Sequence, residues 1–229
     1  SESLLNAAKN YVKASKIEEA ISVLENLLDL YVGTDSAEEG RFQLTVLLID
    51  AQRIEEARNL LDQLINSKNP KQKFLPSALL ISGRMELGQN MPEIASKKFA
   101  KLHNLFSSSP QSDSAYFELA NYLYKNELFV RAGDSFAIAT KKINTESIRT
   151  RALLGLADSR RKSKRSVEAL KHYKELLSKI QLEHPDYLPA LLGQAIALGE
   201  TGSFSSAVSV FRTIITADQQ PESLVALRE

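Results

Sequence analysis

The sequence predicts an all-α fold, a solenoid of stacked helical hairpins. Three observations indicate it: an alanine that returns every 37 or 38 residues, a helical period in the apolar residues around it, and a short polar turn in the middle of each repeat. The marker alanines are Ala20, Ala57, Ala95, Ala132, Ala169 and Ala207. Because one hairpin cannot bury its own apolar face, six copies in phase predict hairpins that stack on one another.

The second half of each repeat reads as a helix with one apolar face. With the marker alanine numbered as position 20, positions 20, 24 and 27 lie on that face, in the order small, large and medium. Position 24 is occupied by Leu24, Leu61, Phe99, Phe136, Tyr173 and Phe211. The small residue lets a neighbouring helix approach, and the large one fills the space beyond it.

The first half of each repeat is also helical, with small residues at position 8. A polar turn follows, and Asn90-Met91-Pro92 forms it in the third repeat, where Pro92 suits the first turn of a helix. In that repeat Gly88 also predicts a turn, two residues earlier than the turns of the other repeats. The segment 36–39, Ser-Ala-Glu-Glu, has the spacing of a capping box and is expected to open the second repeat.

We expect one solenoid over residues 1–229, a piece of a longer protein, because the chain opens inside its first repeat and carries no initiating Met. The expected repeats are 1–35, 36–75, 76–111, 112–147, 148–185 and 186–220, with a trailing helix at 221–229.

The composition limits the classes of function. Lys and Arg number 29 against 28 Asp and Glu, so no global charge favours nucleic acid or membrane as a partner. The first 40 residues are acidic, whereas residues 141–174 are strongly basic. The chain contains no cysteine, which excludes disulfides and thiolate chemistry. No apolar run is long enough to span a membrane.

No pattern of residues predicts catalysis. The three histidines stand at no recognisable metal-binding spacing, and the nucleophile-elbow, zinc-protease and phosphate-loop motifs are all missing. We therefore expect no enzyme activity, no metal and no cofactor.

The segment from Ala115 to Ala139 resembles a tetratricopeptide repeat. The matching residues are Tyr116, Leu119, Ala120, Tyr124, Phe129, Ala132, Phe136 and Ala139. The resemblance extends over nearly the whole chain, although the usual period is about 34 residues and Arg41 stands where an aromatic residue or Leu is typical. It implies a right-handed superhelical solenoid whose first helices line a concave face that holds a partner peptide.

In that family, side chains at positions 5, 9 and 12 point into the concave groove. The resemblance thus implies a partner-binding groove formed by Phe42, Arg84, Phe117, Asn121, Tyr124 and Arg161. Position 5 is apolar in all six repeats, and an alternative interpretation places it in the core. The family's clamp for a C-terminal carboxylate needs a basic residue at position 5 with Asn four residues later, and this chain lacks that pattern.

The densest charge lies in the turn of the fifth repeat. This basic patch comprises Arg160, Arg161, Lys162, Lys164 and Arg165. It is interpreted either as a solvated turn or as a docking site for an acidic partner or a phosphate-bearing ligand. A nuclear-import signal is a further alternative, while a single patch on a neutral chain disfavours nucleic acid.

The function expected from the sequence is a non-catalytic scaffold that binds a partner peptide or protein on its concave face. The long period, with segments such as 106–110, resembles bacterial envelope proteins of the family that act in assembly or secretion, which favours the periplasm or cell envelope over the cytoplasm. Two alternatives stay open: a regulatory or recruiting domain of a larger enzyme, and a self-assembling homo-oligomer whose acidic and basic parts meet head to tail.

Overall fold

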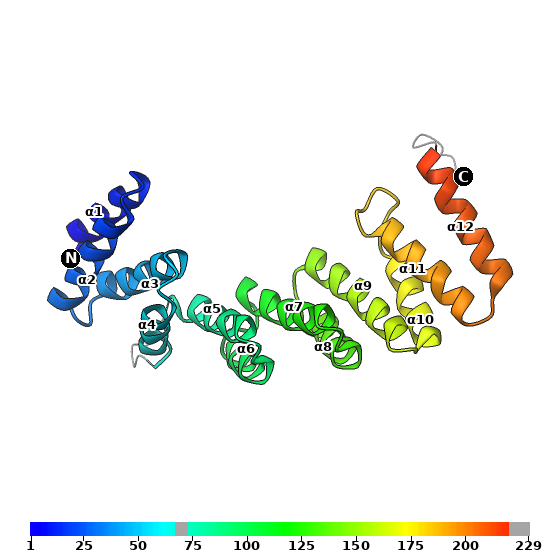
Figure 1. Ribbon diagram of the computed structural model, residues 1–229, viewed down its shortest axis with the longest axis horizontal. Coiled ribbons are helices and arrows are strands. Elements are labelled where there is room, and N and C mark those ends of the chain that lie inside the picture. The colour runs from blue at the N-terminus through cyan, green and yellow to red at the C-terminus, as the bar shows by residue number, and fades with distance from the viewer. Residues whose placement is uncertain (67–72, 220–229) are drawn as a thin grey trace. The chain divides into compact units, whose positions relative to one another are not determined.

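The computed structural model describes residues 1–66 and 73–219 (Figure 1). Helices account for the regular secondary structure of these residues, and no strand occurs among them. The all-α prediction is therefore confirmed. The expected trailing helix at 221–229 lies outside the described residues.

The chain divides into two compact units, which begin at Ser1 and Ser107. The described residues of the first unit form α1 (Glu2–Lys13), α2 (Ile17–Leu30), α3 (Asp35–Asp50), α4 (Ile54–Asn66), α5 (Leu75–Gly88) and α6 (Pro92–Phe106). The second contains α7 (Pro110–Lys125), α8 (Phe129–Lys142), α9 (Glu146–Lys162), α10 (Ser166–Leu177), α11 (Tyr187–Glu200) and α12 (Phe204–Gln219). Within each unit every helix packs against the next, which gives three consecutive hairpins.

All six described hairpins use the same turn. Its central residue has a left-handed backbone, with φ between +57° and +81°, at Ser15, Gln52, Asn90, Glu127, Lys164 and Gly202. The next N–H bonds to the carbonyl five residues earlier, as from Leu128 to Leu123 at 3.0 Å, which is the Schellman arrangement. The turn of the third hairpin is thus centred on Asn90. The expected early turn at Gly88 is wrong, because Gly88 is the last residue of α5.

Hairpin turns have one length, whereas the connections between hairpins vary. Each second helix begins four residues after the first helix ends. The connections range from residues 143–145 to residues 178–186. The capping box expected at 36–39 is corrected here: α3 begins at Asp35, and the Thr34 hydroxyl caps it by accepting the Ala37 N–H at 3.2 Å.

The marker alanines lie in the core, and all six are buried. In the first five hairpins the large side chain at position 24 is at most 2% exposed. In the second unit a glycine makes room for it: a Cβ on Gly155 of α9 would lie 2.5 Å from the Phe136 ring, and Gly193 of α11 lies in the same way over Tyr173. Small residues at fixed positions therefore let the hairpins nest, as the repeat predicted.

Candidate functional site

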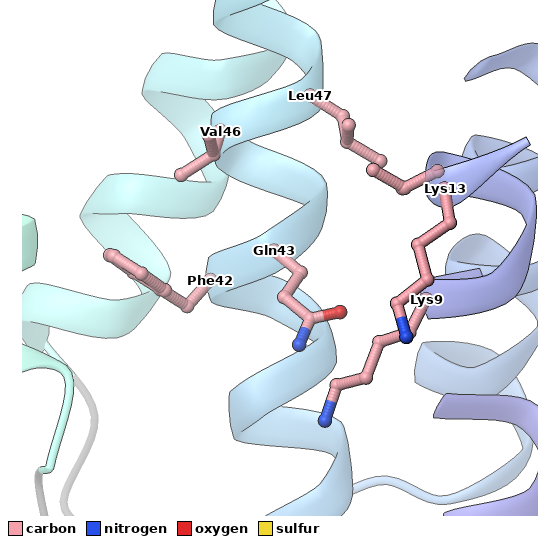
Figure 2. Close-up of a pocket in the computed structure, with 7 residues that line it drawn as sticks. Lys9, Lys13, Phe42, Gln43, Val46 and Leu47 are labelled. Carbon is pink, nitrogen blue, oxygen red and sulfur yellow. The ribbon is translucent and has the colours of Figure 1, made fainter. Parts of the chain in front are cut away.

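An open apolar pocket lies between the first helices of the first two hairpins (Figure 2). Its volume is about 390 Å³. It is lined by Lys9, Val12 and Lys13 of α1 and by Phe42, Gln43, Val46 and Leu47 of α3. These residues come from repeat positions 5, 9 and 12 and their neighbours, the side of the first helices on which the family resemblance placed the groove.

Two of the lining side chains are exposed although they are apolar. Val12 is 40% exposed and Val46 is 36% exposed. The Phe42 ring is held in place by Phe74, because the two rings stack with 5.0 Å between their centres and 20° between their planes. An apolar surface that is open to water and rests on a fixed ring is suited to bury an apolar side chain of another molecule.

The pocket rim is basic. Lys9 extends from α1 toward α3 (Figure 2), and its ammonium lies 2.8 Å from Glu39 Oε1. The Gln43 amide donates to the same carboxylate oxygen at 3.2 Å. Lys13 is exposed, and no ion pair to it is found in the described part of the chain. One of the two ammonium groups is therefore neutralised locally, and the other is available to an acidic group.

In the second unit the corresponding side of α9 carries polar side chains, and they bind neighbouring polar groups. The Tyr173 hydroxyl donates to Asp158 Oδ1 at 2.5 Å, and Arg161 Nε donates to the Tyr173 oxygen at 3.4 Å. Arg161 also lies 3.5 Å from Glu200 of α11. Burial raises the pKa of Asp158, and the hydrogen bond from Tyr173 and the charge of Arg161 oppose that rise. Burial, with the Asp158 charge adding to it, likewise raises the pKa of Tyr124.

The six residues of the predicted groove fall into both units. Phe42 and Arg84 belong to the first unit, where Phe42 lines the pocket and Arg84 lies exposed on α5. Phe117, Asn121, Tyr124 and Arg161 belong to the second unit and are all half-buried. Phe117 packs edge-on against Phe136 and carries the Arg151 guanidinium 5.2 Å from its ring centre. Position 5 is buried at Leu5 and Leu80, so the core interpretation applies to those two leucines.

The basic patch separates into inward and outward parts. Arg160 is 8% exposed, and it pairs with Asp134 at 2.9 Å. Arg161 turns toward Tyr173 and Glu200, as described above. The exposed remainder is Lys162, Lys164 and Arg165. Of these, Arg165 lies 2.8 Å from Glu168. A ligand of this segment could therefore contact three exposed cations, of which Arg165 is already paired with Glu168.

Val12 and Val46 stand at two of the repeat positions that the family resemblance directs into the groove, but the predicted groove residues were polar and aromatic ones. The signal that could have found the two valines is the apolar pair at position 12 of the first repeat and position 9 of the second. In the described residues, no group of three or more His, Asp or Glu side chains is arranged to hold a metal ion. None of the described helices has the length and apolar character that crossing a bilayer requires.

The comparisons with known proteins agree with the geometry. A tetratricopeptide repeat family model matches residues 2–34. The fold is similar to the C-terminal part of a tetratricopeptide repeat-containing protein from Cytophaga hutchinsonii, with TM-score 0.67 and 15% identity over 93% of this chain and 78% of that one. A tetratricopeptide repeat protein from Parabacteroides merdae is similar with TM-score 0.59 and 16% identity, over 94% of this chain and 78% of that one. Pseudomonas aeruginosa pilF is similar with TM-score 0.55 and 15% identity, over 97% of this chain and 93% of that one.

No curated protein matches the chain in sequence. The solved structures are too distant to carry more than the fold. The match of residues 2–34 to the family model and the fold shared with these structures, over the six in-phase hairpins of the described residues, show a tetratricopeptide-like helical repeat fold.

Proposed function

We propose that the chain is a non-catalytic scaffold that binds a segment of a partner protein, and that the pocket between α1 and α3 receives a bulky apolar side chain of that segment. The observation that carries the proposal is the open apolar surface of Val12, Val46 and Phe42. Burying a few large side chains in such a pocket accounts for most of the affinity in peptide recognition.

The charge at the rim narrows the partner chemistry. Because Lys13 makes no ion pair within the described residues while Lys9 pairs with Glu39, we expect a carboxylate of the partner to lie nearest to Lys13. The partner segment is therefore one in which an apolar anchor stands close to Asp or Glu. Phe117, Asn121, Tyr124 and Arg161 of the second unit are proposed as a further contact surface for the same protein.

A displayed library of random peptides tests this proposal. Peptides selected on the whole chain are synthesised, and their dissociation constants are measured by fluorescence anisotropy. Val46→Asp should weaken binding about tenfold or more, because it places a charge in the apolar floor. The matched control is Val130→Asp on α8, a valine that is also exposed, which should leave binding unchanged. Equal binding to both variants, or selected peptides without an apolar anchor, would rule out the pocket.

The cellular process is proposed from the long repeat period, which resembles that of bacterial envelope proteins of the family. A role in envelope assembly or secretion requires the protein to reach the envelope. Fractionation of source cells, with the chain detected by antibody, should recover it with periplasmic or membrane markers. Recovery with cytoplasmic markers alone would exclude the envelope role and would not affect the proposal that the pocket binds a partner segment.

A further inference from the structure

A second cleft lies on the other side of α3, between α2 and α4. Its volume is about 400 Å³. Helix α3 packs against both α2 and α4, and its buried Leu44 and Leu48 form the floor, while Leu28 of α2 and Leu60 of α4 line the sides. Leu44 stands two residues after Phe42, which places the two side chains on opposite sides of α3. The cleft is therefore separate from the pocket between α1 and α3.

The rim of this cleft is acidic. It is formed by Glu25 and Asp29 of α2 and by Glu56 of α4, all three of them exposed. Glu56 is closely paired, because Arg53 Nη2 lies 2.6 Å from its Oε2. The same guanidinium is 3.9 Å from Glu25, and the described part of the chain provides no ion pair to Asp29. One closely paired carboxylate and two others thus surround a leucine floor.

The equivalent cleft of the second unit contains a guanidinium. There α9 packs against both α8 and α10, as α3 packs against α2 and α4. Position 11 of the repeat is Leu48 in α3 and Arg160 in α9. The Arg160 side chain lies 2.9 Å from Asp134 of α8 and 3.9 Å from Glu168 of α10. A cleft of this geometry therefore accommodates a guanidinium between carboxylates of two successive second helices.

The two clefts share further residues, which makes the difference at position 11 specific. Glu56 and Glu168 both hold position 19, and Arg53 and Arg165 both hold position 16. Each of these arginines pairs with the glutamate three residues later, Arg165 with Glu168 at 2.8 Å. The first unit thus has the carboxylates and the turn arginine, but leucine replaces the arginine that fills the cleft of the second unit.

We propose that the cleft between α2 and α4 binds an arginine side chain of a partner protein, in the place that Arg160 occupies in the equivalent cleft. The aliphatic stem of that arginine lies on the leucines, and its guanidinium contacts Asp29 and Glu25. Exposed ion pairs contribute little by themselves. The partner segment is therefore one in which arginine stands next to apolar residues. This inference does not depend on the pocket between α1 and α3.

A pair of short peptides tests the proposal. The amide resonances of the isotope-labelled chain are followed by NMR while acetyl-Leu-Arg-Leu-amide is added to millimolar concentration. We expect the resonances of α2 and α4 around the cleft to shift, equally in the natural chain and in Val46→Asp. The matched peptide contains citrulline, which has nearly the shape of arginine and no charge, and it should bind several-fold more weakly. Added salt should weaken binding of the arginine peptide only.

A double substitution tests the rim. Glu25→Gln combined with Asp29→Asn removes two charges with little change of shape, and it should weaken binding of the arginine peptide several-fold. The control is Glu19→Gln, which neutralises an exposed glutamate of α2 outside the cleft and should leave the dissociation constant unchanged. All three positions are exposed, so each variant is expected to keep its helical circular dichroism.

Three results would overturn the proposal. The first is equal binding of the arginine and citrulline peptides, and the second is an unchanged dissociation constant in the double variant. The third is a dimer of the natural chain, detected by sedimentation, that the double variant fails to form, because it would assign the cleft to a second copy of the chain.

Discussion

The two units bury opposite charges at the same position of the repeat. Position 11 is a core position, held by Leu48 in the second hairpin and Leu123 in the fourth, each 2% exposed. The third hairpin, in the first unit, has Glu86 there, and the fifth hairpin, in the second unit, has Arg160. Both charged side chains are buried, so each depends on partners from neighbouring helices.

The partners differ in quality. Glu86 Oε1 accepts from Arg58 of α4 at 2.8 Å and from Lys98 of α6 at 2.9 Å. Arg160 donates to Asp134 of α8 at 2.9 Å, and its Nε and Nη1 have no hydrogen-bond partner in the described residues. The Glu86 carboxylate thus binds two cations, Arg58 of the preceding hairpin and Lys98 of its own hairpin, whereas the Arg160 guanidinium is only partly satisfied. We expect the first unit to depend on its buried charge far more than the second.

The largest effect is expected from Glu86→Ala. The substitution leaves Arg58 and Lys98 facing each other in a mostly buried site, and loss of one partner of such a cluster costs about 3 kcal/mol. The free energy of unfolding, measured by urea denaturation, should fall by that amount, and amide exchange should speed up in α5. Glu19→Ala, on an exposed glutamate of α2, is the control and should change little. An equal loss in both variants would contradict the comparison.

The pH dependence of the two units should have opposite signs. Burial opposes ionisation of Glu86, but the hydrogen bonds from Lys98 and Arg58 outweigh it and hold its pKa below the ordinary 4.5. Its contribution to stability is present above pH 4.5 and is lost as the pH falls through the lower folded pKa. Burial raises the pKa of Asp158 instead, so its contribution is present at low pH and is lost as the pH rises above the ordinary 3.8.

Amide exchange measured at a series of pH values checks both signs. After correction for the intrinsic exchange rate, acidification should reduce protection of α5 in the natural chain and not in Glu86→Gln. The gain of protection in α9 on acidification should disappear in Asp158→Asn. If α5 and α9 respond in the same direction in the natural chain, the two carboxylates are not the controlling groups.

A smaller effect, equal in the two units, is expected from the hairpin turns. Gln52 and Glu127 hold a left-handed backbone with φ of 60°, which costs a residue with a Cβ more than it costs glycine. Gln52→Gly and Glu127→Gly should each raise the free energy of unfolding by about 0.5 kcal/mol, after the greater chain entropy of glycine is subtracted. Gly202→Ala should lower it. Opposite signs at Gln52 and Glu127 would show that the turns are not equivalent.

The smallest effect is expected from Arg160→Leu. Leucine is the residue found at this position in the second and fourth hairpins, and the change removes two N–H groups that lack partners. Asp134 and Glu168 are largely exposed and can return to water. The free energy of unfolding should therefore stay close to that of the natural chain. A loss as large as that of Glu86→Ala would show that the guanidinium is as important as the carboxylate.

The hairpins were predictable because each one repeats the same local instructions. The marker alanines, the polar turns and the apolar face of each second helix recur six times, so errors in one copy are corrected by the others. Single events were not predictable in this way. Thr34 caps α3 where a capping box two residues later was expected, because several polar residues in 34–39 compete for the role.

The candidate site was predicted only in outline. Phe42 was expected on the binding face, and it lines the pocket. The inward turn of Arg160 was missed, because a charge at position 11 looks like an exposed helix residue until Asp134 is brought beside it by the preceding hairpin. The position in the repeat predicts on which face of its helix a residue lies. It does not predict the residue of the neighbouring hairpin that the side chain contacts.

The uniform turns and variable connections also bear on how such a chain arises. Every hairpin closes with the same backbone, and only the segments between hairpins differ in length. A gene segment that encodes one hairpin can therefore be duplicated or deleted by recombination without redesign of the hairpins that remain, provided that the new joint falls between hairpins. Residues 178–186 are the natural place for an epitope tag or a fused reporter, since a graft there would leave both flanking hairpins closed.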